Sequence, residues 1–194
     1  MRIIAGEAGG RTIRVPRGLG TRPALDRLRV SLFSILDDRM EGASVLDLFA
    51  GAGGFGLEAV SRGARAVTFV ERDAAALAAL ERNISDLGFG GRANVLVGDA
   101  LHVPSHSPRG RRPDEGAPAP AFQVVFLDPP FPLFGDPRSR ALLVDRLEGI
   151  RAGLVARDGV LVCRVPTGER LTESPAPREE RVFGASTVFL FEGA

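Results

Sequence analysis

The chain has 194 residues, of which 44% are hydrophobic and 25% are charged, so it can build the core of one ordinary domain. This composition excludes a protein that is disordered throughout, and no apolar stretch approaches the ~20 residues that a membrane-spanning helix needs. The sequence holds one cysteine, Cys163, and two histidines, so we expect neither an internal disulfide nor a metal site. Because the first residues also lack the apolar centre of a signal peptide, we expect a cytoplasmic protein with no membrane contact.

The positive charge of the chain is unevenly distributed. The formal net charge is only +1, but residues 1–29 hold seven arginines against two acids. This cluster is more informative than the overall charge, because it gives one region of the protein a positive field. We therefore expect residues 1–40 to form a basic extension and residues 41–194 to form the main domain.

Two elements are predicted in the extension. Short extended segments at Arg2–Ala5 and Arg11–Val15 flank a glycine-rich turn, a pattern that predicts a β-hairpin. Apolar residues then recur at helical spacing over Ala24–Asp38, which predicts a helix.

From residue 43 onwards, buried strands alternate with helices. The expected strands are Ser44–Phe49, Ala66–Val70, Asn94–Val97, Phe122–Leu127, Gly159–Val165, Glu180–Gly184 and Ser186–Glu192, the last two as an antiparallel pair. The expected helices are Gly54–Arg62, Ala74–Leu87 with Asp73 as its N-cap, and Arg138–Gly153. Alternation of continuous apolar strands with helices predicts a Rossmann-like α/β fold, with a mostly parallel sheet of seven strands covered by helices on both faces.

One stretch, Pro104–Ala121, breaks this alternation. It holds five prolines and three arginines and too few apolar residues to form a core, so we expect a flexible loop. A basic flap that contacts a polyanionic substrate is the alternative.

Acidic residues end four consecutive predicted strands. Asp47 lies near the end of the first strand, and Glu71, Asp99 and Asp128 follow the next three. Ligands of parallel α/β sheets bind outside the carboxyl ends of the strands, so these four carboxylates indicate a binding site at that edge.

The glycine-rich turn after the first strand allows two interpretations. Residues Gly51–Gly56 match the pattern G-x-G-x-x-G, and Glu71 stands twenty residues after Gly51, where a dinucleotide-binding protein has its ribose ligand. An NAD-dependent oxidoreductase is therefore one interpretation. Asp47 stands four residues before Gly51, however, and a carboxylate there suits the ammonium and sulfonium of S-adenosylmethionine (SAM) better than a pyrophosphate.

The tetrapeptide Asp128-Pro129-Pro130-Phe131 is the most specific chemical signal in the chain. An exocyclic ring amine is a poor nucleophile, and its methylation requires acceptors that orient both of its N–H groups. The Asp128 carboxylate and a rigid backbone carbonyl, that of Pro129, can provide these acceptors, and Phe131 can stack on an extruded base. Catalysis would then consist of positioning and electrostatics, without a cysteine nucleophile.

These motifs together resemble those of class I SAM-dependent methyltransferases, and more narrowly the RsmD family of small-subunit ribosomal RNA guanine-N2 methyltransferases. The segments that carry the resemblance are Arg2–Gly6, Gly10-Arg11, Thr21–Pro23, Asp26-Arg27, Asp47–Gly51, Gly56–Ala59, Ser61–Gly63, Glu71, Asn83 and Asp128–Phe131. The resemblance extends to about Val165.

The resemblance implies a role for each part of the site. The implied cofactor is SAM, with Asp47, Gly51 and Gly53 at its methionine end, Glu71 at the ribose, and Asp99 and Ala100 at the adenine; Phe49, Ala50 and Arg72 are further implied cofactor-binding residues. Asp128, Pro129, Pro130 and Phe131 would hold the target base, and Arg11, Arg22 and Arg27 would contact RNA. The implied partner is small-subunit ribosomal RNA, either free or in the assembling small subunit.

Three other functions are compatible with these motifs. Methylation of adenine N6 or cytosine N4 in DNA would use the same tetrapeptide, since it serves any exocyclic amine. The NAD-dependent oxidoreductase is the second alternative. An RNA-binding assembly factor without catalytic activity is the third.

Overall fold

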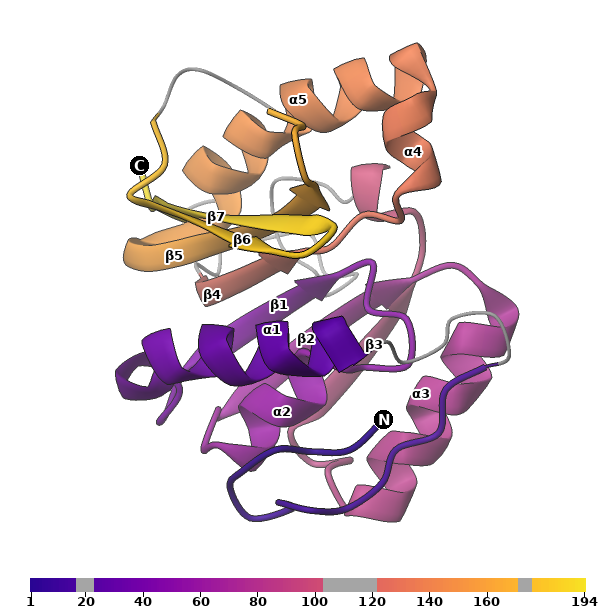
Figure 1. The fold of residues 1–194 in the computed structure, drawn as a ribbon. Coiled ribbons are helices and arrows are strands. Elements are labelled where there is room, and N and C mark those ends of the chain that lie inside the picture. Colours follow the sequence, from indigo (N-terminus) through magenta and orange to yellow (C-terminus); the bar gives the residue numbers. More distant parts are fainter. Residues whose placement is uncertain (17–22, 103–121, 171–175) are drawn as a thin grey trace, which may run out of the picture.

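A computed structural model describes residues 1–16, 23–102, 122–170 and 176–194 of the protein (Figure 1). The strands are β1 (Ser44–Leu48), β2 (Ala66–Glu71), β3 (Ala93–Val97), β4 (Phe122–Leu127), β5 (Val155–Pro166), β6 (Glu179–Phe183) and β7 (Ser186–Glu192). The α-helices are α1 (Pro23–Ile35), α2 (Gly56–Ser61), α3 (Ala74–Leu87), α4 (Pro132–Gly135) and α5 (Pro137–Leu154), and single 3₁₀ turns cover Asp37–Arg39 and Ala100–His102.

All seven strands lie in one sheet, in the order β3-β2-β1-β4-β5-β7-β6. The strands β1 to β5 pair in parallel, whereas β7 runs antiparallel to both of its neighbours, β5 and β6. The predicted seven-stranded, mostly parallel sheet with an antiparallel pair is therefore confirmed. The strand order reverses between β1 and β4, and in open α/β sheets ligands bind at the carboxyl ends of the strands beside such a reversal.

Both faces of the sheet are covered, because neighbouring residues of the inner strands enter two different cores. Val45 and Val124 lie in a core shared with α1, α2 and α3, whereas the next residues, Leu46 and Val125, lie in a core shared with α5. Side chains alternate in direction along a strand, so a strand that is apolar at consecutive positions is buried on both sides. The predicted helices on both faces are confirmed (Figure 1).

The amino-terminal segment forms a short version of the predicted hairpin. Arg2 and Thr12 make an antiparallel bridge, and the backbone N–H groups of Ile3, Gly10 and Ile13 donate to the carbonyls of Arg11, Ile3 and Met1, each at 2.9 Å. The hairpin is attached to α2, because the backbone N–H groups of Ile4 and Ala5 donate to the Glu58 carboxylate at 2.7 and 3.1 Å. The apolar side chains of the segment lie in the same core as α1 and α2.

Most other elements match their predicted ranges to within a few residues. Asp73 caps α3 as predicted, since its carboxylate accepts from the backbone N–H of Ala76 at 2.8 Å. The helix α2 begins at Gly56, two residues later than predicted. The strand β5 begins at Val155, four residues early, and the short helix α4 was not predicted.

Some predictions fall on parts of the chain that the structure does not describe. The predicted flexible loop 104–121 and the segment that contains Arg22 lie almost wholly outside the described residues. Within the described ranges, no helix combines the length and the apolar character needed to cross a bilayer. The described residues include every predicted cofactor residue and the whole predicted catalytic motif, so the site can be built from them.

Candidate active site

Four acidic residues lie along the edge of the sheet where the parallel strands end. Asp47 is near the end of β1 and Glu71 is the last residue of β2. Asp99 and Asp128 come just after β3 and β4. The backbone N–H of Asp128 donates to the carbonyl of Leu48 at 3.4 Å, which ties the end of β4 to the end of β1. Asp47 and Asp128 therefore lie at the point where the strand order reverses.

The chain leaves β1 through a turn whose backbone is left-handed at three positions. The φ angles are +60° at Phe49, +56° at Gly51 and +87° at Gly53. Phe49 is the only non-glycine residue with positive φ among the described residues, and such a conformation costs about 1–3 kcal/mol. A side chain at Gly53 would clash, because its Cβ would lie 2.6 Å from Cδ1 of Leu80. Backbone strain of this kind clusters at ligand-binding sites, so the turn supports its predicted role.

Glu71 holds this turn in place. One oxygen of its carboxylate accepts from the backbone N–H of Gly51 at 2.8 Å, and the other accepts from those of Arg72 and Asp73 at 2.7 and 2.8 Å. A carboxylate has about four acceptor positions, so one remains for a further donor such as a hydroxyl. The geometry therefore connects the end of β2 to the glycine-rich turn before any ligand binds.

Asp47 is a buried carboxylate with one unused oxygen. The side chain is 1% exposed, and Oδ2 accepts from the backbone N–H of Gly56 at 2.8 Å. Among the described residues, Oδ1 is buried and has no hydrogen-bond partner. Burial raises the pKa of Asp47 well above its usual value, the Gly56 N–H opposes this, and the carboxylates of Asp128 and Glu71 raise it further. A cationic group of a ligand is the natural partner for such an oxygen.

The Asp99 carboxylate is already bonded to nearby residues of the chain. Its carboxylate pairs with the Arg72 guanidinium at 2.8 Å and with His102 at 3.3 Å, and it accepts from the backbone N–H of Leu101 at 3.0 Å. Burial acts to raise the pKa of Asp99, but Leu101, Arg72 and His102 together outweigh it and hold the pKa below its usual value. The adjacent Ala100 is 5% exposed. His102 was not among the predicted site residues, although its spacing of three from Asp99 suits a contact within one 3₁₀ turn.

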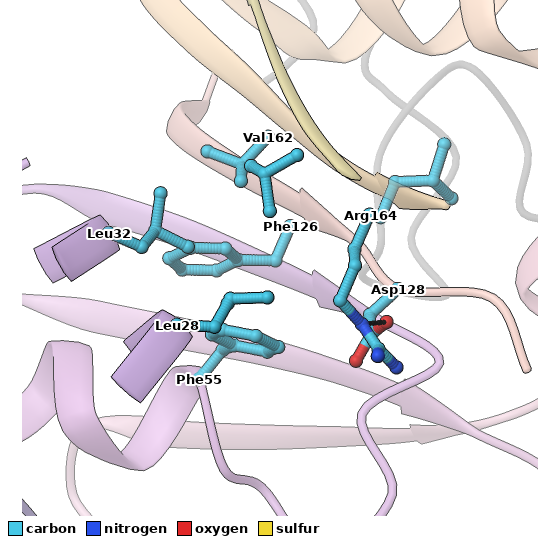
Figure 2. A pocket seen from close by; sticks show the side chains of 9 residues that line it. Leu28, Leu32, Phe55, Phe126, Asp128, Val162 and Arg164 are labelled. Carbon is cyan, nitrogen blue, oxygen red and sulfur yellow. Dashed lines mark hydrogen bonds and ion pairs between the residues drawn. The ribbon is translucent and has the colours of Figure 1, made fainter. Parts of the chain in front are cut away.

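Asp128 is paired with an arginine that sequence reasoning missed. Nε of Arg164, on β5, donates to Oδ1 of Asp128 at 2.5 Å, and the two side chains are 19% and 18% exposed (Figure 2). Burial raises the pKa of Asp128 while Arg164 lowers it, and the net shift is upwards. The parallel register places Cys163 opposite Leu127, so the next residues on each strand meet. The signal in the sequence was a lone charge in the otherwise apolar strand Gly159–Val165.

The predicted base-binding residues form a fixed platform beside this pair. Pro129 is buried, Pro130 is exposed and Phe131 is partly buried. The Phe131 ring packs against Phe134 of α4 in a T-shaped contact with ring centroids 6.4 Å apart. The carbon of the Arg164 guanidinium lies 4.8 Å from the Phe131 ring centroid. The unpredicted helix α4 and the unpredicted Arg164 thus hold the aromatic ring from two sides.

A small cavity of about 10 Å³ lies beneath the Asp128–Arg164 pair, enough for about one water molecule. Its walls come from α1, the N-cap residue of α2, β4, β5 and β7 and are mostly apolar: Leu28, Leu32, Phe55, Phe126, Leu127, Val162 and Val188 (Figure 2). The rings of Phe55 and Phe126 stack with centroids 5.1 Å apart. The amino-terminal helix α1 therefore forms part of the wall below the predicted catalytic residue.

The predicted RNA-binding arginines differ in their surroundings. Arg11 is exposed, but its guanidinium donates to the backbone carbonyls of Asp86 and Leu87, at the carboxyl end of α3. Arg27 is exposed on α1, and Arg22 lies outside the described residues. Arg29, another member of the basic cluster, is only 1% exposed and pairs with Glu58 at 3.1 Å. The cluster therefore contains at least two arginines with structural contacts.

Comparisons with known proteins agree with this geometry. The family model described as "conserved hypothetical protein 95" matches residues 1–192. The chain is 38% identical over 131 residues to ribosomal RNA small subunit methyltransferase D of Escherichia coli K12, an alignment that covers 68% of this chain and 60% of that protein. The chain thus spans about 60% of the length of this curated relative.

Two solved structures extend the comparison to the fold. The E. coli protein yhhF, a candidate methyltransferase, superposes with a TM-score of 0.77 and 29% identity, covering 100% of this chain and 99% of that one. The Thermus thermophilus 16S rRNA N2 G1207 methyltransferase RsmC, in complex with AdoMet and guanosine, superposes with a TM-score of 0.69 and 21% identity, covering 93% and 45%. The second likeness concerns the fold alone. The predicted class I methyltransferase fold is confirmed.

Proposed function

Because the chain belongs to the family described as conserved hypothetical protein 95, the RsmD family, we propose that it is a methyltransferase that acts on ribosomal RNA. More narrowly, the proposed reaction transfers a methyl group from SAM to the exocyclic N2 amine of a guanine in small-subunit ribosomal RNA. The observation that carries the proposal is the position of Asp128 beside the buried Asp47, where the strand order reverses.

The residues at the ends of β1, β2 and β3 fit SAM. SAM, when bound, supplies an activated methyl group on a sulfonium and also carries an ammonium and no phosphate. Oδ1 of Asp47, which is buried and has no hydrogen-bond partner in the described part of the chain, suits a cationic group that would offset the cost of burying that charge. Gly51 and Gly53 allow close approach of the backbone, and Glu71 keeps an acceptor position for a ribose hydroxyl. Asp99 and Ala100 would face the adenine.

The turn after β4 fits an exocyclic amine. Asp128 offers its second oxygen to one N–H of the amine, since Oδ1 is bonded to Arg164. The Pro129 carbonyl would accept the other N–H, and Phe131 would stack on the base. These contacts direct the nitrogen lone pair, and Asp128 stabilises the charge that develops as the new bond forms.

The oxidoreductase alternative fits the fold less well. The common dinucleotide-binding sheet has the order 3-2-1-4-5-6, whereas here an antiparallel β7 separates β5 from β6. A pyrophosphate would also be placed near the buried carboxylate of Asp47, and two negative charges at short distance in a site of low dielectric repel each other strongly.

A labelling experiment tests the proposed function. The protein is incubated with labelled SAM and either small-subunit ribosomal RNA or the small subunit, and the product nucleotide is mapped. We expect N2-methylguanosine from the wild type and from Asp145→Asn, a control at an exposed position of α5, and no product from Asp128→Ala. Undiminished transfer by Asp128→Ala would overturn the mechanism. Label in DNA alone, or RNA binding without product on any acceptor, would replace the proposal by the corresponding alternative.

A further inference from the structure

The side chain of Arg164 makes three contacts with the predicted catalytic turn and its surroundings. Its Nε donates to Oδ1 of Asp128 at 2.5 Å (Figure 2). Its Nη1 donates to Oγ of Ser186 at 3.2 Å, and its guanidinium lies 4.8 Å from the centroid of Phe131. We propose that Arg164 is a positioning residue for methyl transfer: it fixes Asp128 by one oxygen and Phe131 by its ring face, so that the second oxygen of Asp128 meets the target amine. This inference rests on the proposed function.

The geometry leaves Asp128 only partly occupied. Within the described ranges, no other side chain or backbone N–H bonds to its carboxylate, so Oδ2 is available to a substrate. The hydrogen bond from Arg164 to Ser186 joins two paired strands, β5 and β7. In their register Arg164 lies opposite Val188, and Pro166 lies opposite Ser186. The guanidinium is therefore held from a paired strand, and an arginine that is fixed at two nitrogens loses little further freedom when it orients a carboxylate.

Arg164 is also the cation that opposes protonation of Asp128. The titratable groups that face Asp128 are Asp47 on β1 and Cys163 and Arg164 on β5, while Glu71 at the end of β2 acts on Asp47. Burial raises the pKa of Asp128, and Arg164 alone among these groups opposes that rise. A protonated Asp128 would lose one acceptor for the amine, so removal of Arg164 is expected to weaken transfer most at low pH.

A pH profile separates this role from simple stabilisation. We expect the acid limb of kcat/KM for Arg164→Gln to move to higher pH by about one unit or more, because the opposite charge beside Asp128 is lost. Activity of the variant should therefore recover partly as pH rises. Arg164→Lys keeps the charge, so its acid limb stays near that of the wild type, but its KM for RNA rises because an ammonium does not cover the ring of Phe131 as a planar guanidinium does. SAM affinity, measured by calorimetry, is expected to be unchanged in both variants.

Controls decide between the possible outcomes. Arg157→Gln changes an exposed arginine of the same strand and is expected to behave as the wild type. An unshifted acid limb in folded Arg164→Gln, or an equal loss of activity at every pH, would overturn the inference. If that variant does not fold, Arg164→Lys decides, and a wild-type KM for RNA would overturn it. The wild type and Asp128→Asn are assayed on the same RNA. If the wild type gives no methylated product, the proposed function fails; if Asp128→Asn transfers methyl as fast as the wild type, the role of Asp128 and this inference fail together. If Asp128→Asn is inactive while Arg164→Gln keeps the wild-type profile, only this inference fails.

Discussion

Two arginine–carboxylate pairs of the protein have contrasting surroundings. Arg29 and Glu58, where α1 meets α2, are 1% and 0% exposed, whereas Arg164 and Asp128, at the edge of the sheet, are 19% and 18% exposed. The Glu58 carboxylate accepts four hydrogen bonds, two from arginines and two from the backbone of the amino-terminal segment. The Asp128 carboxylate accepts one from Arg164 and, within the described part of the chain, none from any other side chain.

The comparison shows how acceptor capacity distinguishes a structural carboxylate from one that is open to a ligand. A carboxylate has about four acceptor positions. At Glu58 they are filled, so the residue fastens the amino-terminal segment and α1 to the sheet domain. At Asp128 and Asp47 one oxygen is left without a donor among the described residues, and at Asp47 that oxygen is buried, where an unmade bond is costly. That cost is consistent with ligands that complete the bonding.

The largest expected effect comes from breaking the Arg29–Glu58 pair. Glu58→Ala leaves Arg29 buried without its partner and removes the acceptor of two backbone N–H groups. We expect the free energy of unfolding to fall by about 3–5 kcal/mol, measured by denaturant titration followed by circular dichroism. Arg29→Met, which removes the charge but keeps volume, should cost less than that. A loss below about 1 kcal/mol for Glu58→Ala would contradict the structural role assigned to the pair.

Breaking the Arg164–Asp128 pair should change activity rather than stability. Asp128→Asn retains the shape of the side chain but removes the charge that accepts the N–H of the amine, so we expect kcat to fall roughly 10²–10³-fold. The free energy of unfolding should change by less than about 1 kcal/mol, because the pair is partly exposed. A single-turnover assay and a denaturant titration on the same preparation measure both quantities. A strongly destabilised Asp128→Asn would place this pair in the same class as Arg29–Glu58.

Removing the buried charge of Asp47 should stabilise the free protein. Its pKa is raised in the folded state, so the stability that it contributes is present below the pKa of the unfolded chain and is lost as pH rises through the folded value. Asn does not titrate, so Asp47→Asn does not lose this stability as pH rises. The difference in free energy of unfolding, variant minus wild type, should therefore increase by about 1 kcal/mol or more between pH 4 and pH 7. SAM affinity should fall at least about tenfold. A variant that is less stable than the wild type at pH 7 would contradict the assignment.

The sequence predicted the strands and the edge on which the acids lie because hydrophobic periodicity and strand endings are local properties. The bonding around these acids is not local: Arg164 lies 36 residues from Asp128, and Glu58 lies 29 residues from Arg29. The short hairpin at Arg2–Thr12 was predictable from its glycine-rich turn, but its attachment to α2 was not, since the Ile4 N–H donates to Glu58, 54 residues away. A periodic pattern shows which face of an element is buried, but not which polar group from a distant part of the sequence will form hydrogen bonds with it.

The smallest expected effects concern the basic cluster, and they test which arginines contact RNA. Arg27 is exposed on α1, so Arg27→Ala should leave the melting temperature unchanged. If Arg27 neutralises one phosphate, the variant should lower the slope of log affinity against log salt by about 0.7–0.9. Arg11 binds the last carbonyls of α3, so Arg11→Ala should cost about 0.5–1.5 kcal/mol of stability, a fall of a few degrees in melting temperature.

Filter binding to small-subunit ribosomal RNA across a salt series, together with thermal melts, measures both variants. Arg157→Ala, at an exposed position of β5, is the control for the removal of one positive charge, and its salt slope should remain that of the wild type. An Arg27→Ala slope equal to that of Arg157→Ala would remove Arg27 from the predicted RNA surface. An Arg11→Ala variant that melts normally but loses salt dependence would assign Arg11 to RNA rather than to α3. The amino-terminal region would then contain both kinds of arginine, one that binds substrate at the surface and one, Arg29, that is enclosed by the fold.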